Sequence, residues 1–442
     1  MKLNKSWALV LAVCMLLVSA CNFAIADEKT TIGYISWNGG AQQTAEEEWF
    51  ERYEEEHPDV DVNSEYLSWD NYYSKLNTLI AADSCPDIFF SSEDTLINYA
   101  DKGLALNLEP YFEAKGVDMK EVFHPTTMYS NDEGTYSIAN GVSCMVLFYN
   151  KALFAEKGIE MPSLDAENPW TWEQFVEAAK ALTEDANGLH PGDEGFDANS
   201  IRTFGTMAPT GRNAWMPLLY SNGGSIFNED ATGLNLDTPE AKEVFQAIAD
   251  LMLVDKVAPT AALSKSLPAI QQMFKDNQLG MAIDGAWSYL NFKTDDIDVG
   301  IAPLPAFDKP VTIAWASAYL LSSQSKNPQE AFDLLYDFIS IDKNPDQLTF
   351  MSGPNTLDSY TEEGLQEWLY QNDFYNDDYR AVIPQLLTKT AIAGENILVD
   401  CYTPVAAEIV DPALEQVWLG TASLEDVIAQ CYETTADIFS NR

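Results

Sequence analysis

Residues 31–103 decide the fold: TIGYISWNGGAQQTAEEEWFERYEEEHPDVDVNSEYLSWDNYYSKLNTLIAADSCPDIFFSSEDTLINYADKG. Short runs rich in β-branched and aromatic residues predict strands over 31–37, 60–67 and 86–92. Each run is followed by a segment with helical apolar spacing, over 41–58, 69–83 and 94–103. This β/α alternation predicts a parallel sheet covered by helices, which is an α/β fold.

The loops after these strands carry large aromatic and small polar residues. In parallel sheets, ligands bind outside the carboxyl ends of the strands. We therefore expect Trp37 with Asn38, Trp69 and Asp94 to converge on a ligand site. The alternatives are loop packing for Trp37 and Trp69, and a helix N-cap role for Asp94.

The composition limits the class of protein. The chain has 442 residues, 46% of them hydrophobic, which is enough for two globular domains. It contains 24 Lys and Arg residues and 69 Asp and Glu residues, which give a formal net charge of −45. This charge disfavours nucleic acid, anionic membrane surfaces and phosphate-bearing ligands as partners. Its simplest role is to keep the protein soluble.

The N-terminal residues MKLNKSWALVLAVCMLLVSAC have the pattern of a secretory signal: Lys2 and Lys5 precede an apolar run too short to span a membrane. Residues 17–21 resemble the lipobox of bacterial lipoproteins, which implies cleavage before Cys21 and a lipid on its thiol. We expect a signal peptide over 1–20, a tethered linker over 21–29, and anchoring to the outer face of the cell membrane. The alternative is an ordinary signal cut near Ala26.

No metal or other cofactor is expected. The three histidines are scattered, and the cysteines Cys85, Cys144, Cys401 and Cys431 show no CxxC spacing. Export permits disulfides, but the sequence does not select a pairing. Cys144 lies in an apolar run and fits a buried small hydrophobe. The acids of 187–200 lack the order of an EF-hand loop, so solvation is favoured over calcium binding.

A second α/β region follows. Residues 141–154 read as a buried strand running into a helix, and 171–183 as a helix with a capping box of Thr171 and Gln174. In QLGMAIDGAWSYL (278–290), an apolar strand ends at Asp284-Gly285 and Trp287 follows at once. Residues 297–310 form a predicted strand followed by Pro and Gly residues, which predicts a crossing of the chain between lobes. From Asn344 the pattern is mostly helical.

Four stretches together resemble the family 1 extracellular solute-binding proteins of bacterial ABC importers, the maltodextrin-binding type: residues 72–94, 146–163, 169–183 and 278–289. The resemblance runs from about Thr30 to the C-terminus. It implies a two-lobed fold of the periplasmic-binding-protein type, each lobe a mostly parallel sheet flanked by helices, joined by crossing strands. The implied N-terminal lobe is 30–141 plus 304–346, and the C-terminal lobe 142–303 plus 347–442.

The resemblance also implies site residues. Trp287 matches a tryptophan that stacks on the ligand, Asp94 matches an aspartate facing the cleft, and Arg212 and Trp215 border the cleft in the second lobe. Gln278-Leu279 departs from the family's Gly-Lys, and Ser143 stands about where some maltodextrin binders carry a glutamate. The resemblance therefore supports the receptor role of this chain more strongly than it supports any particular sugar as the ligand.

The chemistry of the candidate residues suits a sugar, whose C–H faces stack on aromatic rings and whose hydroxyls meet polar groups. Trp287 opens the next element at a strand's carboxyl end, which favours a cleft wall over core packing. Asp284 and Trp315 are added as candidates, although Trp315 also fits packing.

Three functions compete. The leading one is a non-enzymatic, monomeric receptor that binds an oligosaccharide between two lobes and delivers it to a membrane permease. The chain has no Walker A motif or later spanning segment, so it would be the receptor component alone. A glycoside hydrolase would need an acid pair such as Asp284 and Asp94. A receptor for a polyamine or another non-sugar solute would keep the role and change the ligand.

Overall fold

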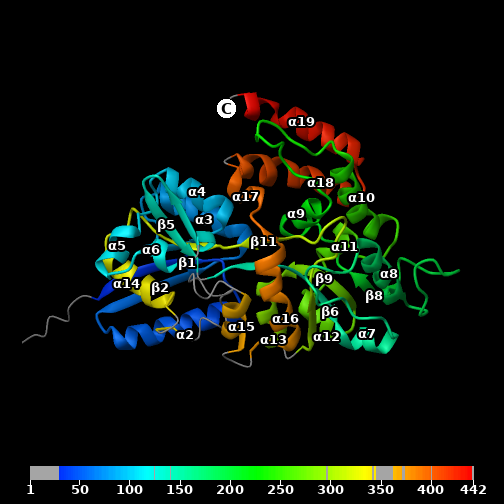
Figure 1. Cartoon of the computed structure of the whole chain (residues 1–442), viewed down its shortest axis with the longest axis horizontal. Coiled ribbons are helices and arrows are strands. Elements are labelled where there is room, and N and C mark those ends of the chain that lie inside the picture. Colours follow the sequence, from blue (N-terminus) through cyan, green and yellow to red (C-terminus); the bar gives the residue numbers. More distant parts are fainter. Residues whose placement is uncertain are drawn as a thin grey trace, which may run out of the picture.

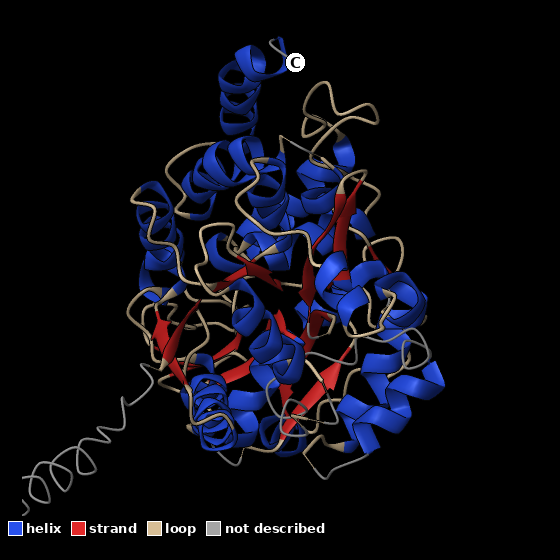
Figure 2. Ribbon diagram, turned by 90° about the vertical axis from the view of Figure 1, so that its left-hand side faces the viewer, coloured by secondary structure: helices blue, strands red, loops and turns tan. Residues whose placement is uncertain are grey.

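The computed structural model describes residues 29–123, 125–139, 141–294, 297–340, 343–344, 362–370, 374–399 and 401–440. The predicted signal peptide, Cys21 and nearly all of the linker lie outside these ranges. The described chain forms two lobes, each built on one β-sheet with helices around it (Figure 1). Figure 2 shows the strands inside the molecule and the helices outside. The predicted two-lobed α/β fold is confirmed.

The first lobe contains a six-stranded sheet in the order β2-β1-β3-β12-β5-β4. Its strands are β1 (Thr30–Ser36), β2 (Val60–Tyr66), β3 (Ile88–Ser91), β4 (Met128–Asn131), β5 (Gly134–Ala139) and β12 (Ala318–Leu321). Its helices are α2 (Ala41–Glu56), α3 (Trp69–Ala81), α4 (Glu93–Asp101), α5 (Glu109–Ala114), α6 (Met119–Val122), α14 (Pro328–Phe338) and the short η1 (Pro125–Thr127). The β/α repeat of residues 31–103 therefore forms as the sequence predicts.

The second lobe contains a seven-stranded sheet in the order β13-β11-β6-β9-β8-β7, with β10 beside β6. Its strands are β6 (Ser143–Asn150), β7 (Glu184–Asp185), β8 (Ile201–Thr206), β9 (Leu279–Gly285), β10 (Val299–Ala302), β11 (Thr312–Trp315) and β13 (Ala391–Ile392). The helices up to residue 294 are α7 (Lys151–Lys157), α8 (Trp172–Leu182), α9 (Arg212–Ser221), α10 (Pro239–Leu253), α11 (Ala261–Ser264), α12 (Ile270–Lys275), η2 (Ala286–Ser288) and α13 (Tyr289–Thr294).

The chain after residue 361 is mostly helical, as predicted. Its elements are α15 (Glu362–Tyr370), α16 (Asp377–Gln385), η4 (Leu386–Thr390), α17 (Glu395–Leu398), η5 (Thr403–Val410), α18 (Asp411–Trp418) and α19 (Leu424–Ser440). Buried residues of α16, η5, α18 and α19 belong to the two hydrophobic cores of the second lobe. Among the described residues, none of the helices combines the length and apolar character that a membrane span requires.

Both sheets are mixed, whereas the family resemblance implied mostly parallel ones. β1 pairs in parallel with β2 and β3, but β12 runs antiparallel to both β3 and β5. In the second sheet, β6 is antiparallel to β9, β10 and β11. In the first sheet the parallel part is the β/α repeat of residues 31–103, and in the second sheet β8 is parallel to β9 and β11 to β13. The antiparallel strands β5, β6, β11 and β12 flank the short connections that run between the lobes. Parallel neighbours need a crossover between them, usually a helix, and the described residues of these connections form none.

The crossing between lobes lies later in the chain than expected. Strand β10 stays in the second sheet, and after it Phe307 stacks on Trp172 with ring centroids 4.8 Å apart. The crossing is made instead by residues 316–317, between β11 in the second sheet and β12 in the first. The implied N-terminal segment 304–346 therefore begins with residues that pack in the second lobe. The Pro and Gly residues of 297–310 indicated a loop, but they did not indicate that this loop stays in the second lobe.

Local predictions in the second lobe agree with the structure. Thr171 and Gln174 form the predicted capping box at the start of α8. Cys144 is fully buried in β6, and burial raises the pKa of its thiol. Asp185 of β7 lies before the loop over 187–200, and its carboxylate accepts hydrogen bonds from the backbone N–H groups of Asn187, Leu189 and Asp197 in that loop.

Candidate functional site

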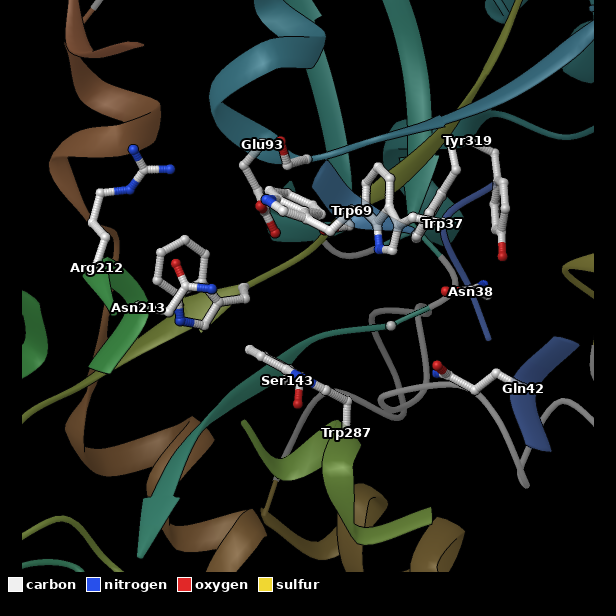
Figure 3. Close-up of a pocket in the computed structure, with 15 residues that line it drawn as sticks. Trp37, Asn38, Gln42, Trp69, Glu93, Ser143, Arg212, Asn213, Trp287 and Tyr319 are labelled. Carbon is white, nitrogen blue, oxygen red and sulfur yellow. The ribbon is translucent and has the colours of Figure 1, made fainter. Parts of the chain in front are cut away.

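A cavity of about 430 Å³ lies between the two lobes. Figure 3 shows Trp37, Trp69 and Glu93 on one side of it and Ser143 and Trp287 on the opposite side. Six of the nine predicted ligand residues line it: Trp37, Asn38, Trp69, Arg212, Trp287 and Trp315. Trp215 and Asp284 are not among the residues that line it, and the side chain of Asp94 lies outside the described part of the structure. The cavity thus unites residues that are distant in the sequence.

The first-lobe wall consists of Trp37, Asn38, Trp69 and Glu93. Trp37 follows β1 and Trp69 begins α3, and their ring centroids lie 4.9 Å apart in an edge-to-face arrangement. Trp37 also packs against Phe90 of β3, with their ring centroids 4.5 Å apart. Trp69 remains 49% exposed. A side chain this apolar, half exposed at the edge of a concave site, suits contact with a ligand.

A buried carboxyl group supports Asn38. The Asn38 amide donates from Nδ2 to Glu46 Oε1 at 2.6 Å, and Tyr34 donates its hydroxyl to Glu46 Oε2 at 3.1 Å. Glu46 lies on the inner face of α2 and is fully buried. Removal from water raises the pKa of Glu46 to about 7, although hydrogen bonds from Asn38 and Tyr34 oppose the rise. Asn38 is therefore held in place by a group that titrates near neutral pH.

An acidic residue that was not predicted, Glu93, lines the cavity at the start of α4. Glu93 is 6% exposed, whereas the side chain of Asp94 lies outside what the structure describes. Asp94 therefore stays a predicted site residue. The sequence held no signal for Glu93.

The second-lobe wall consists of Ser143, Arg212, Trp287 and Trp315. Trp287 lies in η2, directly after β9, as predicted. A Cβ atom on Gly285 would lie 2.0 Å from Cε2 of Trp287, so the indole occupies space that only a glycine leaves open. This close approach explains why Asp-Gly precedes the tryptophan.

Asp284 stabilises this turn and does not line the cavity. Its carboxylate accepts the Gly285 backbone N–H at 2.7 Å and the Ser288 hydroxyl at 2.8 Å. Burial raises the pKa of Asp284, opposed by these two hydrogen bonds. Asp284 was predicted to contact ligand. The structure instead gives it the role of positioning the turn that carries the tryptophan.

Ser143 and Trp315 lie opposite each other in the antiparallel pairing of β6 and β11. Both line the cavity. The Ser143 hydroxyl oxygen and the Trp315 indole nitrogen are buried, and neither has a hydrogen-bond partner among the described residues. Trp315 was predicted as a site residue. Ser143 was noted only for its departure from the family pattern, and its pairing with Trp315 was not predicted.

Arg212 places a positive charge at the cavity, and the carboxylate that pairs with it does not line the cavity. It begins α9, pairs with Asp411 at 3.3 Å between Nη1 and Oδ2, and lies 5.3 Å from the ring centroid of Tyr402. Its neighbour Asn213 also lines the cavity and was not predicted. An arginine engaged in this way offers hydrogen bonds to a neutral ligand without requiring a charged one.

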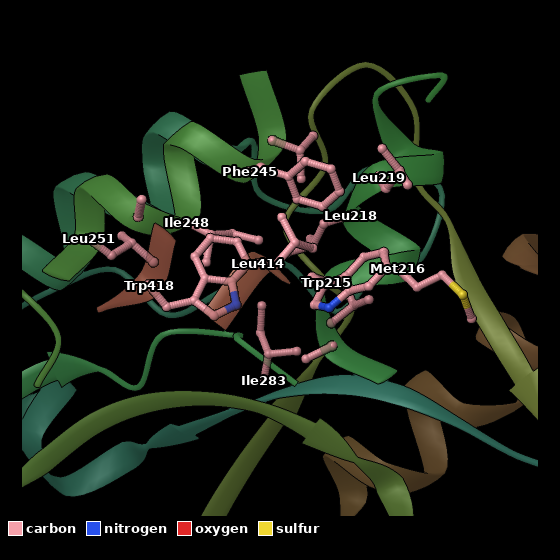
Figure 4. Close-up of a cluster of buried hydrophobic side chains, with 14 of the residues drawn as sticks. Trp215, Met216, Leu218, Leu219, Phe245, Ile248, Leu251, Ile283, Leu414 and Trp418 are labelled. Carbon is pink, nitrogen blue, oxygen red and sulfur yellow. The ribbon is translucent and has the colours of Figure 1, made fainter. Parts of the chain in front are cut away.

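Trp215 belongs to the hydrophobic core, contrary to the prediction. It is 0% exposed, and its ring lies 5.4 Å from that of Phe245 (Figure 4). Helix α9 begins at the cavity and then runs into the lobe, so every residue from Ala214 to Ser221 is buried. Trp215 is one turn too deep to meet a ligand.

Two α/β lobes with aromatic walls facing a shared cavity define a two-lobed solute-binding protein. The chain belongs to the bacterial extracellular solute-binding protein family, whose model matches residues 37–340. It is 25% identical over 385 residues to a binding protein of Brucella abortus (strain 2308), covering 85% of each chain. It is also 25% identical over 292 residues to the arabinooligosaccharide-binding protein of Halalkalibacterium halodurans, covering 63% of this chain and 60% of that one.

The fold is similar to that of the ABC substrate-binding protein Lmo0181 from Listeria monocytogenes, solved in complex with cycloalternan. The TM-score is 0.75 at 26% identity, covering 93% of this chain and 99% of that one.

Proposed function

We propose that this protein is the receptor of an ABC importer, that it binds a neutral oligosaccharide in the cavity between its lobes, and that it delivers the sugar to a membrane permease. The observation that carries the proposal is the composition of the cavity wall. Trp37 and Trp69 from one lobe and Trp287 and Trp315 from the other surround polar groups that are mostly neutral, with one carboxylate, Glu93, and one cation, Arg212. Such a mixture of aromatic faces and hydrogen-bonding groups suits the two surfaces of a sugar.

The names of the relatives support a glycan over other solutes. The Halalkalibacterium protein is named for arabino-oligosaccharides, a Pyrococcus abyssi relative for maltotriose, and the Listeria structure contains cycloalternan. These ligands differ in sugar and in linkage. We therefore propose the class of neutral oligosaccharide and leave its member to the binding experiment.

Ligand-driven closure is the proposed mechanism. Among the described residues, the connections between β5 and β6 and between β11 and β12 join the two sheets and are only a few residues long, so they leave the angle between the lobes free to change. A sugar that contacts both walls binds the closed form better than the open form, and this differential affinity favours closure. The permease would then recognise the closed receptor.

The two alternative functions have less support. A glycoside hydrolase needs two carboxyl groups flanking one bond. Among the described residues that line the cavity, Glu93 is the single carboxylate. A polyamine would need several acceptors for its ammonium groups, but an indole N–H such as that of Trp315 can only donate.

A thermal-shift screen tests the proposal. The chain from Asn22 onward would be heated with malto-, xylo-, manno-, galacto- and arabino-oligosaccharides and with spermidine. A ligand at about 100 times its dissociation constant adds ~2.7 kcal/mol of stability, which raises the melting temperature. A shift with one glycan series supports the receptor. A response to spermidine alone, or to none of the compounds, contradicts a sugar receptor.

We also propose that Cys21 carries the lipid anchor. In a bacterial host, the full chain should sediment with membranes and Cys21→Ser should remain in the soluble fraction. Equal membrane association of the two forms would contradict anchoring through Cys21.

A further inference from the structure

We propose that Ser143 and Trp315 form a binding element for one hydroxyl group of the bound sugar, so that the two residues select ligands carrying a hydroxyl at that position. This inference rests on the proposed receptor function. It adds which atoms distinguish one sugar from another.

The strand register places the two side chains together. Ser143 begins β6, Trp315 ends β11, and the two residues are direct partners in the antiparallel pair. Side chains of directly opposed residues emerge on the same face of a sheet. Both line the cavity between the lobes, whereas Ala314 and Ala316 line a separate cavity. This alternation follows the period of two that an extended strand imposes.

Both residues have a polar atom that the described protein leaves unsatisfied. Ser143 is 3% exposed, and the buried Ser143 Oγ and Trp315 Nε1 have no hydrogen-bond partner among the described residues. Buried polar atoms are nearly always paired in native proteins, because an unmade bond costs the desolvation of the group. Two such atoms on opposed residues of one cavity indicate that a ligand completes their hydrogen bonds.

The chemistry of the two groups defines what they bind. An indole N–H donates only, whereas a serine hydroxyl both donates and accepts. A sugar hydroxyl can accept from Trp315 Nε1 and donate to Ser143 Oγ at the same time. A deoxy sugar satisfies neither atom, and an ammonium group cannot accept from the indole. The pair therefore favours a hydroxyl and disfavours both a C–H group and a cation.

The test compares ligand affinity with the stability of the ligand-free protein. Ser143→Ala, Trp315→Phe and the double variant would be titrated calorimetrically with maltotriose, arabinotriose, xylotriose, mannotriose and galactotriose. Each single variant should weaken binding of the glycan that binds the wild type about tenfold. The loss in the double variant should be smaller than the product of the two single losses, because both residues contact one hydroxyl.

The ligand-free melting temperature separates recognition from structure. Ser143→Ala removes a buried atom that lacks a partner, so its melting temperature should stay unchanged or rise. Ser130→Ala and Trp170→Phe are matched controls, because neither residue lines the cavity. They should leave affinity unchanged.

Each result decides the question. Weaker binding by both single variants, with a stable ligand-free Ser143→Ala protein, supports the pair. The proposed pair is overturned if either single variant keeps the wild-type affinity. It is also overturned if Ser143→Ala loses as much ligand-free stability as it loses affinity. In both cases, glycan binding by the wild type would still support the receptor function. If the wild type binds none of the five glycans, the proposed function fails and the pair fails with it.

Discussion

The two walls of the cavity are built on different principles. In the first lobe, Trp37 and Trp69 lean on other aromatic rings, and Trp69 is half exposed. In the second lobe, Trp287 fills the space above Gly285, and the hydrogen bonds of Asp284 hold the turn that carries it. Groups that are fixed before binding lose less conformational entropy when a ligand arrives. The difference suggests that the second-lobe wall determines affinity and that the first-lobe wall adapts.

The largest effect is expected from Trp287→Ala in the second-lobe wall. It should weaken binding of the glycan identified by the thermal-shift screen roughly a hundredfold, about 3 kcal/mol, because a preorganised stacking surface is lost. Calorimetric titration measures the change. Trp170→Phe, outside the cavity, is the control, and a loss below threefold would contradict the importance of the second-lobe wall.

The support of the first-lobe wall should depend on pH through Glu46. Its pKa of about 7 in the folded protein exceeds its ordinary value of 4.5, so the fold favours the protonated form. This contribution to stability is complete below pH 4.5 and is lost as the pH rises through 7. The free energy of unfolding should therefore fall by about 2 kcal/mol between pH 5 and pH 7 from this group alone.

Denaturant titrations at several pH values measure this effect. The Glu46→Gln variant is the reference, because its amide keeps an acceptor for Asn38 and Tyr34 without titrating. The comparison also removes the pH dependence of the other acidic residues. Parallel stability profiles for the two proteins would show that Glu46 titrates normally.

Gly285→Ala tests how firmly the second-lobe wall is held. The new methyl group would collide with the Trp287 indole, which must move. We expect about a tenfold loss of glycan affinity, ~1.4 kcal/mol. Gly233→Ala is the matched control, because the nearest atom to its added Cβ lies at 3.5 Å, an ordinary contact. Affinity retained in Gly285→Ala would mean that the indole position is not critical.

The smallest effect is expected from Trp69→Ala in the first-lobe wall. Ordering a half-exposed ring offsets part of its stacking energy, so the loss should be about fivefold, ~1 kcal/mol. The same titration gives the value. A loss equal to that of Trp287→Ala would remove the distinction between the two walls.

The sequence predicted the parts of the protein that depend on local pattern. The β/α repeat of residues 31–103 and the helix cap at Thr171 formed as expected, because apolar period and capping chemistry act over a few residues. The placement of Trp287 after a buried strand was read in the same way. Six of the residues predicted from such patterns and from the family resemblance line the cavity.

The sequence did not reveal the features that depend on direction and pairing. Trp215 and Arg212 are near neighbours, but only the path of α9 into the lobe decides that one is core and the other lines the cavity. Glu93 lines the cavity from the start of α4, and no local pattern indicated it.

The sequence by itself determined the class of fold, the position of the tryptophans Trp37 and Trp287 at strand ends and the acidic character of the chain. Tertiary structure alone decided which polar groups line the cavity. Ser143 and Trp315 meet only because β6 and β11 pair in one register. Local propensity specifies a strand, but the partner of each residue is fixed by the packing of the whole sheet.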